Sequence, residues 1–236
     1  MTEEKSASDD SGFILVDKPE GITSHDVIAR LRRITGIKKI GHAGTLDPAA
    51  AGLLLCAIGR PATRCLNEFV KLDKEYEAKI ILGKVSATYD REGKISQAYA
   101  GKPLSRREVA AALISFLGKQ DQVPPMFSAK KINGKKLYQL ARSGVEIERR
   151  PATIEIYELK ILKYRWPELS ARVKCSSGTY IRTLADDLGK KLGCGAYLAG
   201  LTRTAIGKFN LKKARKLAKI NQANWRKLIF RKKCYN

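Results

Sequence analysis

Residues 41–52 read GHAGTLDPAAAG, a glycine-punctuated stretch that carries one carboxylate, Asp47. Its glycines permit backbone conformations and a close approach of a ligand that a Cβ would prevent. Pro48 restricts the backbone directly after Asp47 and lacks an amide donor. The pattern predicts an active-site loop that holds Asp47 in one place. A structural turn, in which Asp47 accepts hydrogen bonds from backbone amides, fits the same residues.

The chain is strongly basic. Its 236 residues include 46 Lys and Arg against 23 Asp and Glu, which gives a formal net charge of +23. In a protein of this size such an excess indicates a polyanionic partner, with nucleic acid as the first candidate and a plain solvated basic surface as the alternative. A membrane is disfavoured, because the chain has no apolar run of about 18 residues and no leader-like start. We therefore expect a cytoplasmic protein.

Metal binding is not expected from the side chains that most often hold metals. The five cysteines are scattered without a C-x-x-C pair, and the two histidines, His25 and His42, lack the spacing of zinc ligands. We predict reduced, mostly buried thiols and no metal site. Asp186 and Asp187 do not change this prediction, since adjacent residues point to different faces of a helix.

The order of helix and strand patterns predicts an α+β domain. Strands are expected over 13–16, 53–58, 76–82, 126–132, 154–162 and 169–175. Helices are expected from a Ser24 cap to Gly36, over 61–69, from a capping box at Ser105 to Gly118, and over 135–143 and 179–192. We divide the chain into a disordered tail over 1–11, a domain over 12–210 and a basic helical tail over 211–236.

Five separated segments carry further motifs. They are Lys18-Pro19-x-Gly21, Gly41-His42-x-Gly44-Thr45-Leu46-Asp47-Pro48, Lys74-x-Tyr76, Ser128-Ala129-x-Lys131, and Cys175–Thr183 followed by Asp187-Leu188-Gly189 and Leu201-Thr202-Arg203. In this order and spacing the chain resembles the TruB family of tRNA pseudouridine synthases, enzymes that make pseudouridine at position 55 of the T loop. The resemblance covers residues 12 to about 210. It implies the pseudouridine synthase fold, in which helices flank a mixed, largely antiparallel sheet.

The resemblance implies catalytic roles for Asp47, Tyr76 and Arg182. The reaction breaks a C–N glycosidic bond, turns the uracil and rejoins it through carbon, and Asp47 corresponds to the essential carboxylate beside the sugar. Attack on the anomeric carbon and removal of a ribose proton both stay open. Arg182 matches the arginine that pairs with this aspartate, where a helix-surface salt bridge is the plainer interpretation. Tyr76 matches the tyrosine that stacks on the base and helps remove the C5 proton, although an inward strand tyrosine is otherwise core.

The resemblance also implies a set of substrate-binding residues. His42 matches a histidine associated with opening the T loop, and Leu201 and Ile181 correspond to the apolar wall of the uracil pocket. Lys18 and Pro19 are expected to support the strand that bears Tyr76. The full predicted set is Lys18, Pro19, His42, Gly44, Thr45, Lys130, Lys131, Tyr180, Ile181 and Leu201.

The predicted partner is the T arm of tRNA, without a cofactor, a metal or a required protein partner, for a monomeric enzyme. A uracil inside a folded T loop must be extruded, and phosphate contacts must offset the cost of unstacking. The densest internal basic cluster is expected to grip the RNA backbone; its members are Lys130, Lys131, Lys135 and Lys136.

One departure from the family pattern concerns the C-terminal end. Family members continue into a small RNA-binding module, which we expect to be absent here and replaced by the basic tail over 211–236. Thr202 also stands where an arginine often follows the leucine. A non-catalytic RNA-binding or tRNA-folding protein of the same fold is the alternative function. A protein that acts in a guide-RNA complex on ribosomal RNA is disfavoured, since such proteins carry the missing module.

Overall fold

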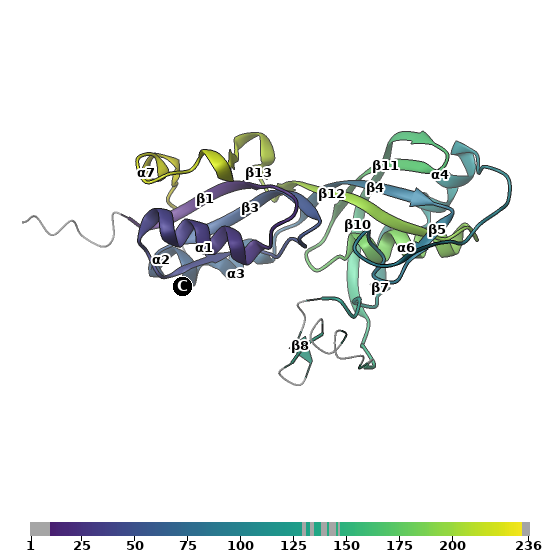
Figure 1. Ribbon diagram of the computed structural model, residues 1–236, viewed down its shortest axis with the longest axis horizontal. Coiled ribbons are helices and arrows are strands. Elements are labelled where there is room, and N and C mark those ends of the chain that lie inside the picture. The colour runs from purple at the N-terminus through teal and green to yellow at the C-terminus, as the bar shows by residue number, and fades with distance from the viewer. Residues whose placement is uncertain are drawn as a thin grey trace, which may run out of the picture. The chain divides into compact units, whose positions relative to one another are not determined.

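The computed structural model describes residues 10–128, 131–132, 135–137, 141, 145 and 147–232. Internal contacts divide the chain into two compact units, where we predicted a single domain over 12–210. Unit 1 comprises Met1–Lys74 and Thr202–Asn236, and unit 2 comprises Glu75–Leu201. One strand, β12 (Ala196–Ile206), runs through the second boundary (Figure 1).

Unit 1 is a sheet with helices on its two faces. Its strands are β1 (Gly12–Lys18), β2 (Ile40–His42), β3 (Ala50–Ile58), β13 (Phe209–Asn210), β14 (Arg215–Lys216) and the end of β12. Strand β1 is antiparallel to β3 and parallel to β14, and β2 also pairs antiparallel with β3. Its helices are α1 (Ser24–Thr35), α2 (Arg60–Arg64), α3 (Leu66–Val70), α7 (Trp225–Leu228) and the short 3-10 turns η1 (Leu211–Lys213) and η2 (Leu217–Lys219).

The continuous apolar run in β3 is explained by burial on both faces of the sheet. Leu54, Cys56 and Ile58 pack in one cluster with the inward face of α1 and with Trp225. The alternate residues of β3 pack in a second cluster with α2 and α3, where Phe69 is 1% exposed. A strand covered on both faces has no polar side, and this confirms the strand predicted at 53–58.

The start of unit 1 corrects two predictions. The N-cap of α1 is Thr23, whose side chain accepts from the amide of Asp26 while the Asp26 carboxylate accepts from the amide of Thr23. Ser24, the predicted cap, instead bonds with its hydroxyl to the backbone of Leu46. The reciprocal Thr23–Asp26 pair provides the hydrogen bonds of the capping box at the start of the helix. Ser11, which we placed in the tail, is buried, donates to the Ile58 carbonyl and accepts from the Ala62 amide.

The helical structure predicted for the basic tail over 211–236 is wrong for most of its described part. The segment consists of η1, β14, η2 and the four-residue α7, and Phe230 forms a backbone bridge with Phe13. Leu217, Ile220 and Trp225 are nevertheless buried in the cluster under α1, as their apolar pattern suggested. Packing against unit 1 therefore overrides the helical spacing of these residues.

Unit 2 is built on five neighbouring strands in the order β12-β4-β11-β10-β7. Besides β12, its strands are β4 (Lys74–Leu82), β5 (Lys84–Ser86), β6 (Ile95–Gln97), β7 (Gly118–Gln122), β8 (Lys131–Ile132), β9 (Lys135–Lys136), β10 (Ala152–Arg165) and β11 (Glu168–Cys175). Its helices include α4 (Arg106–Ile114) and α6 (Ile181–Lys191). Strand β10 is antiparallel to both β11 and β7, and β5–β6 and β8–β9 form separate two-stranded sheets.

The period-two pattern of β4 is confirmed, since Tyr76, Ala78, Ile80 and Leu82 are buried and alternate with more exposed residues. The helix predicted over 135–143 is wrong at its start, where Lys135–Lys136 form β9 in a hairpin with β8. Leu137 and Ala141 are helical, and the other residues of the prediction, 138–140 and 142–143, lie outside the described residues. Strand β12 was not predicted, because its alanine and glycine residues give a weak strand pattern.

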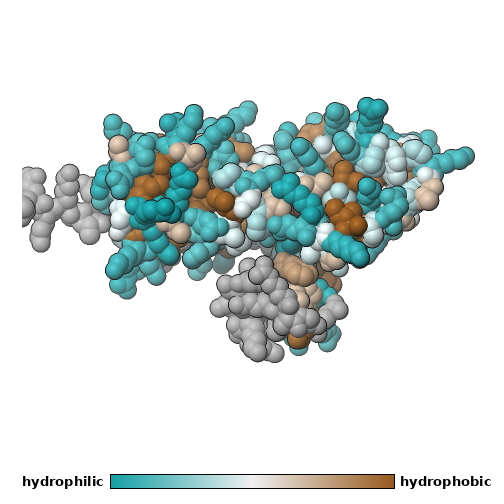
Figure 2. Space-filling model, viewed as in Figure 1, coloured by the Kyte–Doolittle hydropathy of each residue, from teal (hydrophilic) through white to brown (hydrophobic). Residues whose placement is uncertain are grey.

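The structure confirms the α+β class and the mixed, largely antiparallel sheet. Figure 2 shows mainly hydrophilic residues on the faces in view, with smaller hydrophobic patches. Cys56, Cys175 and Cys194 are buried, reduced thiols, as predicted, whereas Cys65 is disulfide-bonded, a pairing that its sequence spacing did not indicate. Among the described helices, none has the length and apolar character needed to span a membrane.

Candidate active site

The loop that carries Asp47 is anchored on both sides of the carboxylate. Before it, the buried Ser24 hydroxyl accepts from the Leu46 amide across 2.9 Å and donates to the Leu46 carbonyl across 3.1 Å. After it, the Pro48 carbonyl accepts from the Gly21 amide across 2.9 Å. The Asp47 side chain is itself half-buried. Anchors on the two neighbouring residues hold the position of Asp47 before any ligand arrives, as an active-site carboxylate requires.

Two of the loop glycines lie next to Arg203 and have left-handed backbone, and one of them leaves no room for a side chain. Gly52 has φ +105°, and a Cβ there would overlap the backbone of Arg203, with the Arg203 nitrogen 2.7 Å away. Gly44 has φ +95°, and its carbonyl accepts from Arg203 Nη2 across 3.1 Å. The glycine spacing of the loop therefore reflects both left-handed backbone and close packing.

Arg203 is a residue to which the sequence assigned no role. Its side chain is 1% exposed, and its Nε donates to the Leu53 carbonyl across 2.8 Å in addition to the bond to Gly44. Its guanidinium therefore joins β12 to the Asp47 loop and to β3 at once. The one sequence signal was its place in the Leu201-Thr202-Arg203 motif.

Lys18, at the end of β1, is fully buried in unit 1. Its Nζ donates to the carbonyls of Pro19, across 2.9 Å, and Ile22, across 2.7 Å. Burial lowers the pKa of Lys18 to about 8; the Asp47 carboxylate opposes this shift, and the charge of Arg203 adds to it. Lys18 and Asp47 therefore attract one another. The predicted support of the Tyr76 strand by Lys18 and Pro19 stays a prediction.

His42 ends β2 and is half-buried. Burial lowers the pKa of His42, and the charge of Arg203 lowers it further, against a hydrogen bond involving Gly44 that raises it. The imidazole is therefore neutral at pH 7. Its Nδ1 is buried and has no hydrogen-bond partner in the described part of the chain. Thr45, three residues further on, is exposed.

In unit 2, Arg182 lies in the first turn of α6 and is held by two acceptors. Its Nη1 donates to Asp90 Oδ2 across 2.9 Å, and its Nη2 donates to the Phe127 carbonyl across 2.6 Å. The side chains of Arg182 and Asp90 are each 6% exposed, so this is a buried ion pair. The predicted pairing of Arg182 with Asp47 concerns residues of the two different units and stays a prediction.

Asp90 is the second functional candidate that the sequence did not indicate. Its Oδ1 accepts from the Thr88 hydroxyl across 2.6 Å and from the Glu92 amide across 3.0 Å, which leaves Oδ2 for Arg182. The preceding Tyr89 has φ +65°, an unusual backbone conformation for a residue with a side chain. Hydrogen bonds to neighbouring residues thus fix the orientation of the Asp90 carboxylate toward Arg182.

The N-terminus of α6 is held to β7 by a buried amide side chain. Gln122 accepts from the Tyr180 amide across 2.8 Å and donates to the Tyr180 carbonyl across 3.0 Å. Gln122 is 5% exposed, Ile181 is buried and Tyr180 is half-buried. This two-way bond fixes the backbone that presents Arg182.

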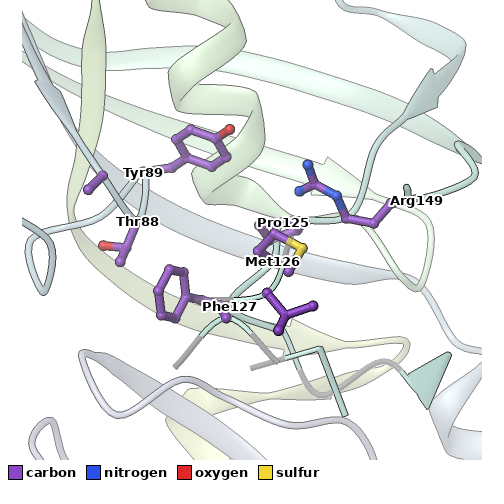
Figure 3. A pocket seen from close by; sticks show the side chains of 9 residues that line it. Thr88, Tyr89, Pro125, Met126, Phe127 and Arg149 are labelled. Atoms are coloured by element: carbon purple, nitrogen blue, oxygen red, sulfur yellow. The ribbon is translucent and has the colours of Figure 1, made fainter. Parts of the chain in front are cut away.

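Unit 2 contains a cavity of about 250 Å³ (Figure 3). Phe127, whose carbonyl binds Arg182, lines it, and so does Tyr89, which directly precedes Asp90. Figure 3 also shows Met126 and Arg149 at this cavity. Its aromatic and apolar walls with one cationic side chain suit a planar polar ring.

The predicted site residues are divided between the two units. Unit 1 holds Lys18, Pro19, His42, Gly44, Thr45 and Asp47, and unit 2 holds Tyr76, Lys131, Tyr180, Ile181, Arg182 and Leu201. Tyr76 is 8% exposed on β4, and Leu201 is half-buried. Lys130 lies outside the described residues, and for Lys131 the structure describes only the strand.

Metal-ligating residues do not gather in the part of the chain that the structure describes: it contains no group of three His, Cys, Asp or Glu side chains able to hold an ion. Asp186 pairs with Lys190 across 2.6 Å one turn along α6. Burial raises the pKa of Asp187, with Lys190 opposing the shift. The adjacent aspartates thus have separate surroundings.

Two family models match this chain. A model described as "TruB family pseudouridylate synthase (N terminal domain)" matches residues 32–181, and one described as "tRNA pseudouridylate synthase B C-terminal domain" matches residues 182–232. The second match covers most of the segment where we expected a basic tail instead of the family's C-terminal module.

Similar proteins carry related names. The proteins named tRNA pseudouridine synthase B from Opitutus terrae and Protochlamydia amoebophila are 48% and 51% identical to it, over 85% of this chain and 83% and 76% of their own. A solved Cbf5-Nop10-Gar1 complex contains a chain that is 29% identical, with a TM-score of 0.71 over 92% of this chain. A solved H/ACA RNP bound to a substrate RNA containing 2'-deoxyuridine contains one that is 27% identical, with a TM-score of 0.66 over 88% of this chain. This chain spans 56% and 51% of those two chains.

Proposed function

Because this chain belongs to the TruB family of pseudouridylate synthases, we propose that it isomerises uridine to pseudouridine at position 55 in the T loop of tRNA. The relatives named tRNA pseudouridine synthase B support pseudouridine formation in tRNA. The position in the T loop rests on the family resemblance of the motifs. The observation that carries the proposal is the anchored Asp47 loop, which presents one carboxylate at a fixed position.

Asp47 is the group that we assign to the chemical step at the sugar. The C–N glycosidic bond breaks, the uracil turns, and a C–C bond forms between C5 of the base and the same sugar carbon. The C5 proton is removed and N1 gains a proton, so the composition of the nucleotide does not change. A carboxylate fits as a nucleophile at the anomeric carbon or as a base toward a ribose proton. The Lys18 ammonium attracts the Asp47 carboxylate, and such attraction is stronger away from water.

We assign the handling of the base to residues of unit 2. Tyr76 stacks on the uracil and helps to remove its C5 proton, and Ile181 and Leu201 contribute apolar wall. Arg182 is assigned to the ion-pair network of the reaction, supported by its two fixed acceptors. His42 is assigned to the opened T loop, where a neutral imidazole can stack or accept a hydrogen bond.

The uracil must leave the T-loop stack before it can react, and we propose that the enzyme flips it out. Unstacking costs a few kcal/mol, which phosphate contacts and stacking on aromatic side chains offset. The formal net charge of +23 supports this assignment, since the RNA backbone is the matching polyanion. The T-arm grip of the cluster around Lys131 rests on the sequence alone.

The proposal is tested by mapping pseudouridine in an unmodified tRNA transcript after incubation with the purified protein in EDTA. Carbodiimide treatment and primer extension then report each modified position. We expect one new stop at the T-loop uridine, and none in a matched transcript with cytidine at that position. Tight binding without any stop would favour the non-catalytic tRNA-folding alternative. A stop at another uridine would contradict the proposed position.

A further inference from the structure

Unit 1 contains a groove of about 740 Å³ between the second half of α1 and the turn that precedes α7. Its floor is apolar, made by the buried Ile220 and the partly buried Ile34. Its rim carries Arg30 and Arg33 on one side and a turn at 221–223 on the other. The volume is ample for a nucleotide, since ligand pockets measure roughly 300–1,000 Å³.

The rim of this groove presents hydrogen-bond donors without an acidic counterpart. Arg30 and Arg33 are exposed, and within the described part of the chain neither forms an ion pair or a side-chain hydrogen bond. Asp26, one turn before Arg30, is occupied by the Thr23 cap. Among the described residues, no Asp or Glu lines the groove. Two guanidinium groups one turn apart suit the oxygens of a phosphate.

The opposite rim is held rigid by its own hydrogen bonds. Asn221 Oδ1 accepts from the amides of Ala223 and Asn224, each across 3.1 Å. Asn224 Oδ1 accepts from the Asn221 amide, and its Nδ2 donates to the Lys219 carbonyl. Because Asn221 Oδ1 accepts hydrogen bonds within the turn, the side-chain Nδ2 of Asn221 is the atom that can bind a ligand. This nitrogen is a hydrogen-bond donor.

The groove lies within reach of RNA whose target uridine is at Asp47. Ser24 at the start of α1 holds the Asp47 loop, and a helix rises about 1.5 Å per residue, so Arg30 and Arg33 lie roughly 9 and 14 Å further along the helix. That is about three to four stacked nucleotides at ~3.4 Å each. We propose that this groove binds the phosphate backbone of the substrate RNA a few nucleotides from the reacting uridine. The inference rests on the proposed function.

The test compares two charge-matched double variants. Arg30→Gln with Arg33→Gln removes the groove cations, and Arg106→Gln with Arg107→Gln removes two exposed arginines from the start of α4 as the control. Dissociation constants for an unmodified tRNA transcript are measured over a salt series, together with the single-turnover rate at saturating enzyme. A third variant, Arg30→Lys with Arg33→Lys, keeps the charge.

We expect the groove variant to bind tRNA about tenfold more weakly and to flatten the slope of log affinity against log salt by about one to two, with the saturating rate unchanged. The control and the lysine variant stay within about threefold of the wild type. Unchanged affinity and slope in the groove variant, or an equal loss in the control, overturn the proposal. Loss of binding to anionic phospholipid vesicles with unchanged tRNA affinity would assign the groove to a membrane and overturn it too.

A failure of the proposed function gives a different result. If the wild type binds tRNA but forms no pseudouridine, the catalytic proposal fails while the salt slopes still report whether the groove binds RNA. If the wild type is active and the groove variant binds equally well, only the groove assignment fails.

Discussion

Arg182 Nη1 and Asp90 Oδ2 lie 2.9 Å apart in a buried ion pair, although 92 residues separate them in the chain. Both partners form further hydrogen bonds. Arg182 donates to the Phe127 carbonyl, and Asp90 accepts from the Thr88 hydroxyl and the Glu92 amide. Burial makes the pair costly to break, because the remaining charge stays out of water without its partner. The first turn of α6 therefore depends on a residue in a distant loop of the same unit.

Asp90→Asn should both destabilise unit 2 and slow catalysis. The substitution removes the negative charge that holds Arg182, so we expect a loss of about 3–5 kcal/mol in the free energy of unfolding and at least a tenfold lower single-turnover rate. Denaturant titration and rapid-quench assays measure the two. Asp186→Asn is the control: its partner Lys190 is 66% exposed, and the pair should contribute under about 1 kcal/mol. Equal effects of the two substitutions would contradict the account.

Gly52→Ala should lower the free energy of unfolding by more than the strain of a left-handed backbone conformation alone would. Gly52 and Gly193 both have positive φ, but a Cβ meets the Arg203 backbone at Gly52 and nothing within 4 Å at Gly193. We expect about 1–2 kcal/mol for Gly193→Ala and about 3 kcal/mol or more for Gly52→Ala. Thermal or denaturant unfolding of both variants gives the difference. Equal losses would show that the close approach to Arg203 is unimportant.

The pH dependence of the reaction should contain the titration of Lys18. The pKa of Lys18 is lowered to about 8 by burial, so the side chain is charged below that pH and neutral above it. Above pH 8 the attraction between Lys18 and Asp47 is lost, and we expect the single-turnover rate to fall. Lys18→Arg keeps a cation at alkaline pH and should abolish this decline. A decline near pH 8 that persists in a folded Lys18→Arg variant would exclude Lys18 as its cause.

Arg203 should affect catalysis in two ways: it holds the Asp47 loop in place, and its charge lowers the pKa of Lys18. Its guanidinium lowers the pKa of Lys18, so Arg203→Met should move the alkaline decline to higher pH while slowing the reaction, and Arg203→Lys should leave the midpoint near that of the wild type. A scaffold role alone would reduce the rate without moving the midpoint. The pH–rate profiles of the two variants, compared at equal folded fraction, separate these outcomes.

Local sequence patterns predicted those parts of the fold that depend on neighbouring residues. The apolar run of β3, the alternation around Tyr76 and the capping box at Ser105 each have a signature within a few residues, and the structure confirms all three. The reciprocal Thr23–Asp26 cap shows the limit, since Thr23 and Ser24 are both good capping residues and only the spacing to Asp26 distinguishes them.

The remainder could not be predicted because it depends on contacts between distant residues. Arg203 reaches the Leu53 carbonyl across 150 residues of chain, and no periodicity reports such a bond. The segment after Asn210 has helical spacing, but the sheet and α1 offer its apolar side chains a better burial than a helix does. The Asp47 loop was recognisable from its own residues, whereas its supports, Ser24 and Arg203, lie outside it.

The most direct measurement is single-turnover pseudouridine formation by Asp47→Asn at saturating enzyme, beside its dissociation constant for tRNA. Asparagine keeps the size and the anchored loop but can neither attack the sugar nor remove a proton. We predict tRNA binding within about threefold of the wild type and a rate at least about 1,000-fold lower. A folded variant that retains a rate within tenfold of the wild type would contradict the assignment of Asp47 as the reacting carboxylate.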